Sequence, residues 1–113
     1  MIRITKVYDY DCPVCLQMGT FEGNVLFNVA PNTHFSAVEI GQLTSLDNEN
    51  EHECLIAQLV ERYACNPDYT VDLPIYMFTE GRTYLGHIGG EHTAAEFRAE
   101  IQKILDAAQN QTS

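Results

Sequence analysis

The chain is 113 residues long, 45% of its positions are hydrophobic, and 16 acidic residues against six Lys and Arg give it a net charge of −10. This length fits one domain spanning residues 1–113, and the even spread of apolar residues disfavours a disordered chain. The acidic balance argues against binding to nucleic acid or to an anionic membrane, because both depend on cations that neutralise phosphates.

The distribution of charge is uneven along the chain. Between Lys6 and Arg62 there is no Lys or Arg, whereas nine acids fall in that stretch. These acids either form a solvated surface or steer a basic patch of a protein partner. The first residues lack the apolar core of a secretory signal, and no apolar run approaches the roughly 18 residues of a membrane span. We therefore expect a cytoplasmic protein, and a monomer.

The chain begins with a predicted strand followed by a helix. Residues 2–8 alternate apolar and polar side chains, which is typical of a strand. Pro13 suits the first turn of a helix, and a stripe of apolar residues continues over 14–29. Gly19 and Gly23 weaken that helix by roughly 1 kcal/mol each, so we expect it to bend or break.

In the middle of the chain the sequence predicts a strand, a helix, and then two strands joined as a hairpin. Alternation marks the strands, spacing of three and four residues marks the helix, and Gly81 marks the hairpin turn. The predicted segments are, in order, a strand at 34–40, a polar loop at 41–50, a helix at 51–64, and strands at 75–78 and 83–88.

The last predicted element is a helix. Thr93 and Glu96 fit a capping box, in which each side chain accepts a hydrogen bond from the backbone of the other. The apolar spacing continues to about Ala108, and we expect the tail beyond it to fray. The order β-α-β-α-β-β-α, without repeats or linkers, indicates one layered α/β domain.

A pair of cysteines lies where the first strand passes into the first helix. In Cys12-Pro13-Val14-Cys15, two intervening residues on a helical turn bring the sulfurs together. Thiol–disulfide exchange needs an attacking thiolate, which a helix N-terminus favours, and a second thiol that resolves the mixed disulfide. We therefore predict that Cys12 is the exposed attacker, that Cys15 is the buried resolver, and that the two form a reversible disulfide without a bound cofactor.

The other two cysteines do not fit a metal site or a disulfide. Cys54 and Cys65 lie on and just past a predicted helix, and eleven residues of helix separate them by about 16 Å. That is too far for one zinc ion or one S–S bond. We expect no metal here, and we expect two single thiols that pack as small hydrophobes, with a regulatory role as the alternative.

Two acids flank the first cysteine of the pair. Asp9 and Asp11 disfavour a thiolate on Cys12 and so oppose the helix N-terminus. Either both carboxylates face solvent and are screened, or they slow the nucleophile at neutral pH. In the second case the site would prefer basic protein partners over glutathione, which is itself anionic.

On these residues the chain resembles the thioredoxin superfamily over nearly its whole length. The cysteine motif after a strand is similar to the family's active site, and Pro74 before an apolar strand is similar to its cis-proline. Gly89-Gly90, fifteen residues after Pro74, resembles the glycines beside the substrate groove. The resemblance implies a thioredoxin-like fold, with a central four-stranded mixed sheet flanked by helices.

The resemblance also implies a substrate site. The Leu73–Pro74 bond would be cis, Pro74 would touch the Cys12 sulfur, and both residues would pair with the substrate as a short strand. Gly89 and Gly90 would leave room for that strand. The implied substrate-binding residues are Pro13, Val14, Leu73, Pro74, Gly89 and Gly90.

The implied activity is that of a dithiol–disulfide oxidoreductase. It would reduce protein disulfides and take electrons from a reductase or from glutathione. The alternatives are a glutathione-dependent glutaredoxin, with backbone donors at 90–93 for a carboxylate, and a non-enzymatic thiol module that binds a metal or a partner.

Three positions depart from the family pattern. Lys6 stands where thioredoxins carry a buried acid, and Asp11 stands where they usually have tryptophan. Asp9 stands where glutaredoxins often place the lysine that holds glutathione. The chain also lacks the additional strand and helix with which thioredoxins begin.

Overall fold

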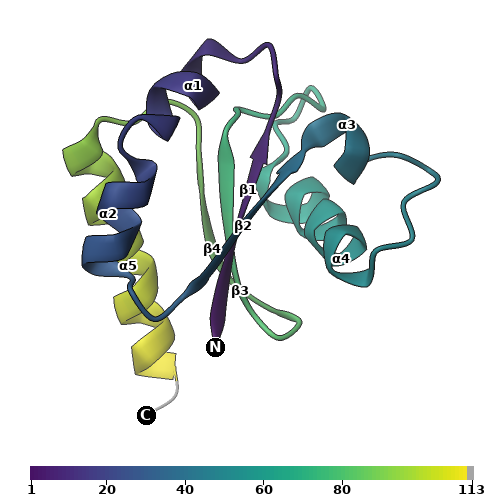
Figure 1. Ribbon diagram of the computed structural model, residues 1–113. Coiled ribbons are helices and arrows are strands. Elements are labelled where there is room, and N and C mark those ends of the chain that lie inside the picture. Colours follow the sequence, from purple (N-terminus) through teal and green to yellow (C-terminus); the bar gives the residue numbers. More distant parts are fainter. Residues whose placement is uncertain (112–113) are drawn as a thin grey trace.

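Four strands form one mixed sheet in the order β2-β1-β3-β4 in the computed structural model, which describes residues 1–111 (Figure 1). β1 pairs in parallel with β2 and antiparallel with β3, and β3 pairs antiparallel with β4. The prediction of an α/β fold with a four-stranded mixed sheet is therefore confirmed. The strands are β1 (Ile2–Tyr8), β2 (His34–Glu39), β3 (Ile75–Glu80) and β4 (Thr83–Gly89).

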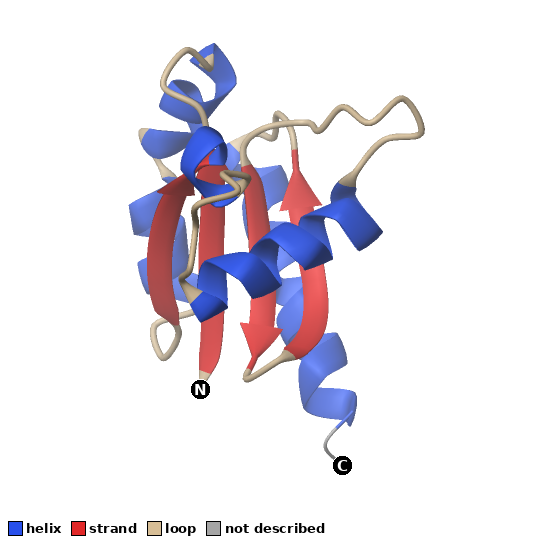
Figure 2. Cartoon of the chain, turned by 90° about the vertical axis from the view of Figure 1, so that its right-hand side faces the viewer, coloured by secondary structure: helices blue, strands red, loops and turns tan. Residues whose placement is uncertain are grey.

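Helices cover both faces of this sheet. One face carries α1 (Pro13–Gly19), α2 (Glu22–Val29) and α5 (Ala94–Gln111). The other carries α3 (Ile40–Leu43) and α4 (Glu51–Leu59), which crosses in front of the strands in Figure 2, and the π-helix η1 (Val60–Ala64). Within residues 1–111, none of the helices is both long and apolar enough to cross a bilayer.

The predicted helix over 14–29 does break, as its glycines indicated. α1 ends at Gly19, and α2 begins three residues later at Glu22. The backbone N–H of Thr20 turns back to the carbonyl of Gln17 at 3.2 Å. Gly23 lies within α2, so the break occurs only near the first glycine.

Several predicted boundaries are wrong. The strand predicted to reach residue 40 ends at Glu39, whose carboxylate caps a short helix, α3, inside the segment predicted as a loop. The helix predicted over 51–64 changes to π-helical geometry at Val60. α5 continues to Gln111 rather than fraying after Ala108, and Thr112 and Ser113 lie outside the described residues.

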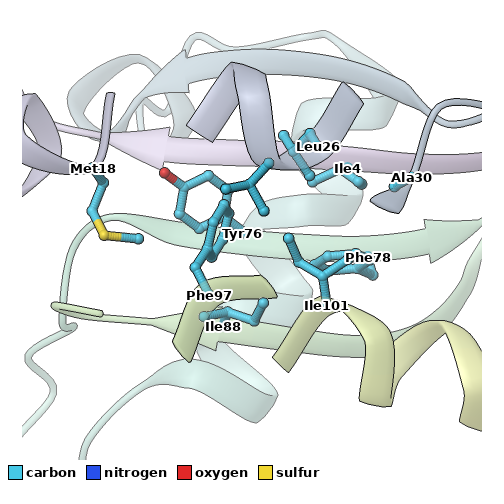
Figure 3. Close-up of a cluster of buried hydrophobic side chains, with 10 residues drawn as sticks. Ile4, Met18, Leu26, Ala30, Tyr76, Phe78, Ile88, Phe97 and Ile101 are labelled. Carbon is cyan, nitrogen blue, oxygen red and sulfur yellow. The ribbon is translucent and has the colours of Figure 1, made fainter. Parts of the chain in front are cut away.

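Two apolar cores lie on opposite faces of the sheet. Under α2 and α5, the ring of Phe97 packs on Tyr76 with a centroid separation of 4.6 Å (Figure 3). Under α4, Val7 and Met77 pack against Ile56. Because β1 is central, it is buried on both faces and provides a rigid support for the turn that follows it.

Candidate active site

Cys12 occupies the position directly before the first turn of α1. Its backbone is extended, Pro13 is the first helical residue, and the Cys12 sulfur accepts a hydrogen bond from the backbone N–H of Cys15 at 3.1 Å. The first N–H groups of a helix have no partner within the helix, so a sulfur at this position satisfies one of them. The predicted cap position of Cys12 is therefore present, and its side chain is partly exposed.

Cys15 lies one turn further, beneath Cys12. It is 4% exposed. Burial, together with a hydrogen bond from the Cys15 thiol to the Cys12 sulfur, raises the pKa of the Cys15 thiol to about 11. Cys15 is therefore protonated at neutral pH and shielded from large substrates, whereas Cys12 is accessible.

The segment before β3 meets the cysteines from the opposite side. The Leu73–Pro74 peptide bond is cis, as the resemblance implied. The Cys12 thiol points at the carbonyl oxygen of Leu73, with 3.9 Å between sulfur and oxygen. Leu73 is half-buried and Pro74 is buried, so at this segment the partly exposed Leu73, rather than Pro74, is within reach of a substrate.

The glycines after β4 pack against the same segment. The backbone N–H of Gly90 donates to the carbonyl of Pro74 at 3.1 Å, and the φ of Gly90 is +84°, a conformation that favours glycine. A Cβ on Gly89 would lie 3.3 Å from the backbone oxygen of Asp72. The structure thus brings together the cysteine turn, Leu73–Pro74 and Gly89–Gly90.

Pro13 and Val14, the two residues between the cysteines, face different surroundings. Pro13 is exposed at the start of α1. Val14 is half-buried and packs against the core under α2 and α5. Pro13 is therefore the more accessible of the two.

The acids before Cys12 order the loop. The backbone N–H of Asp11 donates to the Asp9 carboxylate at 3.3 Å, and the N–H of Cys12 donates to the Asp9 carbonyl at 3.2 Å. One Asp9 oxygen is thus turned toward its own loop, while Asp11 is exposed to solvent. This geometry agrees with the alternative in which solvent screens the Asp11 charge.

A buried ion pair lies behind Cys15. The Lys6 ammonium is 2.7 Å from a Glu22 carboxylate oxygen and 3.5 Å from the carbonyl oxygen of Cys15. The Tyr76 hydroxyl donates to the other Glu22 oxygen, and burial raises the pKa of that hydroxyl well above its ordinary value. Lys6 is 8% exposed, so the position that departs from the family pattern is occupied by a neutralised, buried cation.

No protein-family model and no curated protein sequence matches this chain. Solved structures do match it. Thioredoxin 1 of Thermosipho africanus gives a TM-score of 0.58 at 11% identity, over 95% of this chain and 98% of that one. The thioredoxin of Fasciola hepatica gives 0.56 at 16% identity, over 90% and 79%. Mitochondrial thioredoxin 3 of Saccharomyces cerevisiae gives 0.57 at 16% identity, over 90% and 77%.

The chain has the thioredoxin fold. In this thioredoxin-fold protein a cavity of about 580 Å³ borders Cys15 on the side of the sheet that carries α1. Its wall includes the Lys6–Glu22 pair and Phe35 of β2, and it does not include Cys12. The cavity is thus separate from the surface formed by Cys12 and Leu73.

The remaining cysteines of this thioredoxin-fold protein lie apart from the site. The Cys54 thiol donates to the carbonyl of Asn48 at 3.4 Å, and the Cys65 thiol donates to the carbonyl of Asn66 at 3.5 Å. Neither is in a disulfide. Within residues 1–111, no group of three or more His, Cys, Asp or Glu side chains is arranged to hold a metal ion.

Sequence reasoning missed the role of Glu22. Its partner, Lys6, is 16 positions away, and in the sequence Glu22 was only one of the nine acids between Lys6 and Arg62. One signal was available. Alternation from Ile4 places Lys6 on the same, apolar face of β1, and a cation on such a face needs an acidic partner.

Proposed function

We propose that this thioredoxin-fold protein is a thiol–disulfide oxidoreductase that reduces protein disulfides. The observation that carries the proposal is the arrangement of the two thiols. Cys12 is accessible and accepts the backbone N–H of Cys15 at 3.1 Å, and Cys15 is buried directly behind it. An accessible nucleophile with an adjacent, enclosed thiol is what a two-step exchange requires.

In the first step, the Cys12 thiolate attacks one sulfur of a substrate disulfide. A new S–S bond forms between Cys12 and that sulfur, the substrate S–S bond breaks, and the second substrate sulfur leaves as a thiolate that takes a proton from water. The N–H of Cys15 stabilises the attacking charge on Cys12 before the bond forms.

In the second step, Cys15 loses its proton and attacks the Cys12 sulfur. The Cys12–Cys15 bond forms, the mixed disulfide breaks, and the substrate sulfur that was bonded to Cys12 leaves as a thiolate. The substrate has then gained two electrons, and the protein is the oxidised disulfide. A dithiol reductase or glutathione must supply two electrons to restore it, which suits a reducing compartment such as the cytoplasm.

The surroundings of Cys12 favour an extended substrate segment. The Leu73 carbonyl, 3.9 Å from the sulfur, is an acceptor for a backbone N–H of the substrate. A Cβ on Gly89 would crowd the backbone of Asp72. Glycine at this position therefore leaves space beside Leu73 for a substrate segment. Residues Pro13 and Leu73 would contact the substrate, and Val14, Pro74, Gly89 and Gly90 would shape the surface around them.

The glutathione-dependent alternative has weaker support. The backbone donors expected at 90–93 are partly engaged, since the N–H of Gly90 binds Pro74 and the N–H of Thr93 binds Glu96. Lys6, the cation that contacts the Cys15 carbonyl, is paired with Glu22. Protein disulfides therefore fit the site better than an anionic tripeptide does.

Reduction of insulin disulfides tests the proposal. The protein is assayed with dithiothreitol, with a thioredoxin reductase system and with glutathione, in parallel. We expect catalysis with dithiothreitol, its loss in Cys12→Ser, and a stable mixed disulfide in Cys15→Ser. The matched control is Cys54→Ser, which should retain full activity because Cys54 lies apart from the site.

Two results would contradict the proposal. One is activity in Cys12→Ser equal to that of the unaltered protein. The other is the absence of catalysis above the dithiothreitol background with every reductant. Catalysis with glutathione alone would instead establish the glutaredoxin alternative.

A further inference from the structure

The two edges of the sheet differ in how they are protected. β2 pairs only with β1, and the six paired positions between them run without a bulge. Its residues, His34 to Glu39, include no Pro, Lys or Arg. Proteins usually protect such an edge with proline, lysine, a bulge or a covering element, because unpaired N–H and C=O groups invite another strand.

The opposite edge, β4, is protected. A register shift lies between Phe78 and Thr79, where β3 meets β4. α5 packs so closely on β4 that a Cβ on Gly86 would lie 3.0 Å from Ile104. The ring of Tyr63 stacks on Tyr84 at 3.8 Å. The contrast indicates that the open β2 edge is a specific feature rather than a general property of this sheet.

Apolar side chains accompany the open edge. Phe35 of β2 is 40% exposed, and Phe27 of α2 is 75% exposed. Ala37, two residues after Phe35 on the same face, is also exposed. Phe35 and Ala37 border the 580 Å³ cavity under α1, where exposed Leu16 forms part of the opposite wall. A strand added beside β2 would therefore find both backbone partners and a recess for its side chains.

Figure 1 looks onto this edge, with β2 running in front of the other strands. α1 and α2 lie to one side of the strand, and α3 and α4 lie to the other. None of these helices is drawn across the near side of β2. A partner segment can thus approach β2 without meeting the backbone of a helix.

The net negative charge of the chain favours a partner segment that carries positive charge. Arg3 of β1 lies opposite His34, the ammonium of Lys6 is neutralised by Glu22, and no Lys or Arg occurs between Lys6 and Arg62. Asp9 borders the cavity. A second copy of this chain, with its own net charge of −10, would be repelled, whereas a segment that carries Lys or Arg would be attracted.

We propose that the β2 edge binds an extended segment of a partner protein in which apolar residues alternate with Lys or Arg. The segment pairs its backbone with β2, its apolar side chains pack on Phe35 and Ala37, and its cations offset the net charge of −10 of this chain. The inference does not depend on the redox activity, because neither Cys12 nor Cys15 takes part in it.

Titration of the ¹⁵N-labelled protein with a short cysteine-free peptide that alternates valine with lysine tests the proposal. We expect the largest shifts in the backbone amides of residues 34–39, with slower hydrogen exchange there. Phe35→Lys should weaken binding about tenfold, because it repels the peptide and removes an apolar contact. The matched control on the protected edge, Thr83→Lys, should change binding by less than about twofold.

A second peptide, in which glutamate replaces lysine, sets the charge requirement. We expect it to bind at least about tenfold more weakly. The proposal is overturned if the shifts fall on β4 or around Cys12, if the acidic peptide binds equally well, or if no shift is seen. Sedimentation that shows dimers lost in Phe35→Lys would assign the edge to a second copy instead. Both altered positions are exposed, and unchanged shifts elsewhere verify the fold.

Discussion

The two pairs of cysteines in this chain have the same chemistry and opposite surroundings. The Cys12 sulfur accepts an N–H at 3.1 Å and has only a distant carbonyl acceptor, that of Leu73 at 3.9 Å. At Cys54 and Cys65 the sulfur instead donates to a carbonyl oxygen, at 3.4 Å and 3.5 Å. A donor that points at sulfur stabilises a thiolate, whereas a carbonyl acceptor stabilises the thiol. Position relative to backbone groups therefore distinguishes the proposed nucleophile from the two packed thiols.

The structural elements that carry the two pairs of cysteines differ as well. The turn with Cys12 and Cys15 follows the buried central strand and lies against the Lys6–Glu22 pair. Cys54 and Cys65 lie on α4 and after the π-helix, where side chains are half-buried. The first region is thus supported by a buried strand and an ion pair, and the second lies on and after helices on the opposite face. Each of the following experiments alters one side of this comparison.

Removal of the cation behind Cys15 should have the largest effect. Lys6→Met leaves the half-buried Glu22 carboxylate without its ion partner, and we expect a loss of about 3 kcal/mol in the free energy of unfolding, measured by urea denaturation. The exposed pair Lys103–Glu100 provides the control, since Lys103→Met should cost less than about 1 kcal/mol. Equal losses in the two variants would show that the Lys6–Glu22 pair stabilises the fold no more than an exposed pair does.

The next prediction concerns reactivity toward iodoacetamide. The pKa of Cys15, raised from 9.0 to about 11, reduces its thiolate at neutral pH about 100-fold, so Cys12 should be labelled first. Labelling of Cys15 should rise as the pH approaches 11. Peptide mass spectrometry measures both sites, and faster labelling of Cys15 at neutral pH would reverse the assigned roles.

The same pKa shift predicts how stability depends on pH. The folded state favours the protonated Cys15 thiol, so this contribution is fully present below pH 9.0 and is lost as the pH rises to about 11. Cys15→Ala should remove this part of the alkaline loss. An unchanged alkaline profile in Cys15→Ala would mean that other groups cause it.

A smaller effect is expected beside the second pair. Tyr63 of η1 stacks on Tyr84 with ring planes 3° apart, and Tyr63 is 41% exposed. Tyr63→Ala should lower the free energy of unfolding by about 1 kcal/mol, measured by urea denaturation. Tyr63→Phe keeps the stacked ring and should behave like the unaltered protein.

The smallest effect is expected at the second pair itself. Cys54→Ser and Cys65→Ser should each change stability by less than about 1 kcal/mol, because both thiols are only half-buried. Mass spectrometry of the oxidised protein should find a Cys12–Cys15 bridge. A Cys54–Cys65 bridge would show that this region moves far enough to join two thiols that are unpaired here.

The sequence predicted the strands well because their alternation reflects which face each residue occupies. It also predicted the helix break, which occurs after Gly19, a poor helix former, whereas Gly23 lies inside α2. It missed α3, because that helix depends on the Glu39 carboxylate as a cap rather than on apolar spacing. It missed the Lys6–Glu22 pair for a different reason. The pair forms only when α2 folds back over β1, which no local pattern encodes.

The parallel pairing of β1 with β2 has a consequence for how a partner could be processed. Tyr8 and Glu39 are opposite one another, so both strands end at the level where the loop to Cys12 begins. A segment seated along β2 in parallel would therefore leave the sheet near the nucleophile. A disulfide a few residues beyond that segment would be tethered, with an effective concentration on the order of millimolar. Attack on it would no longer depend on a chance encounter.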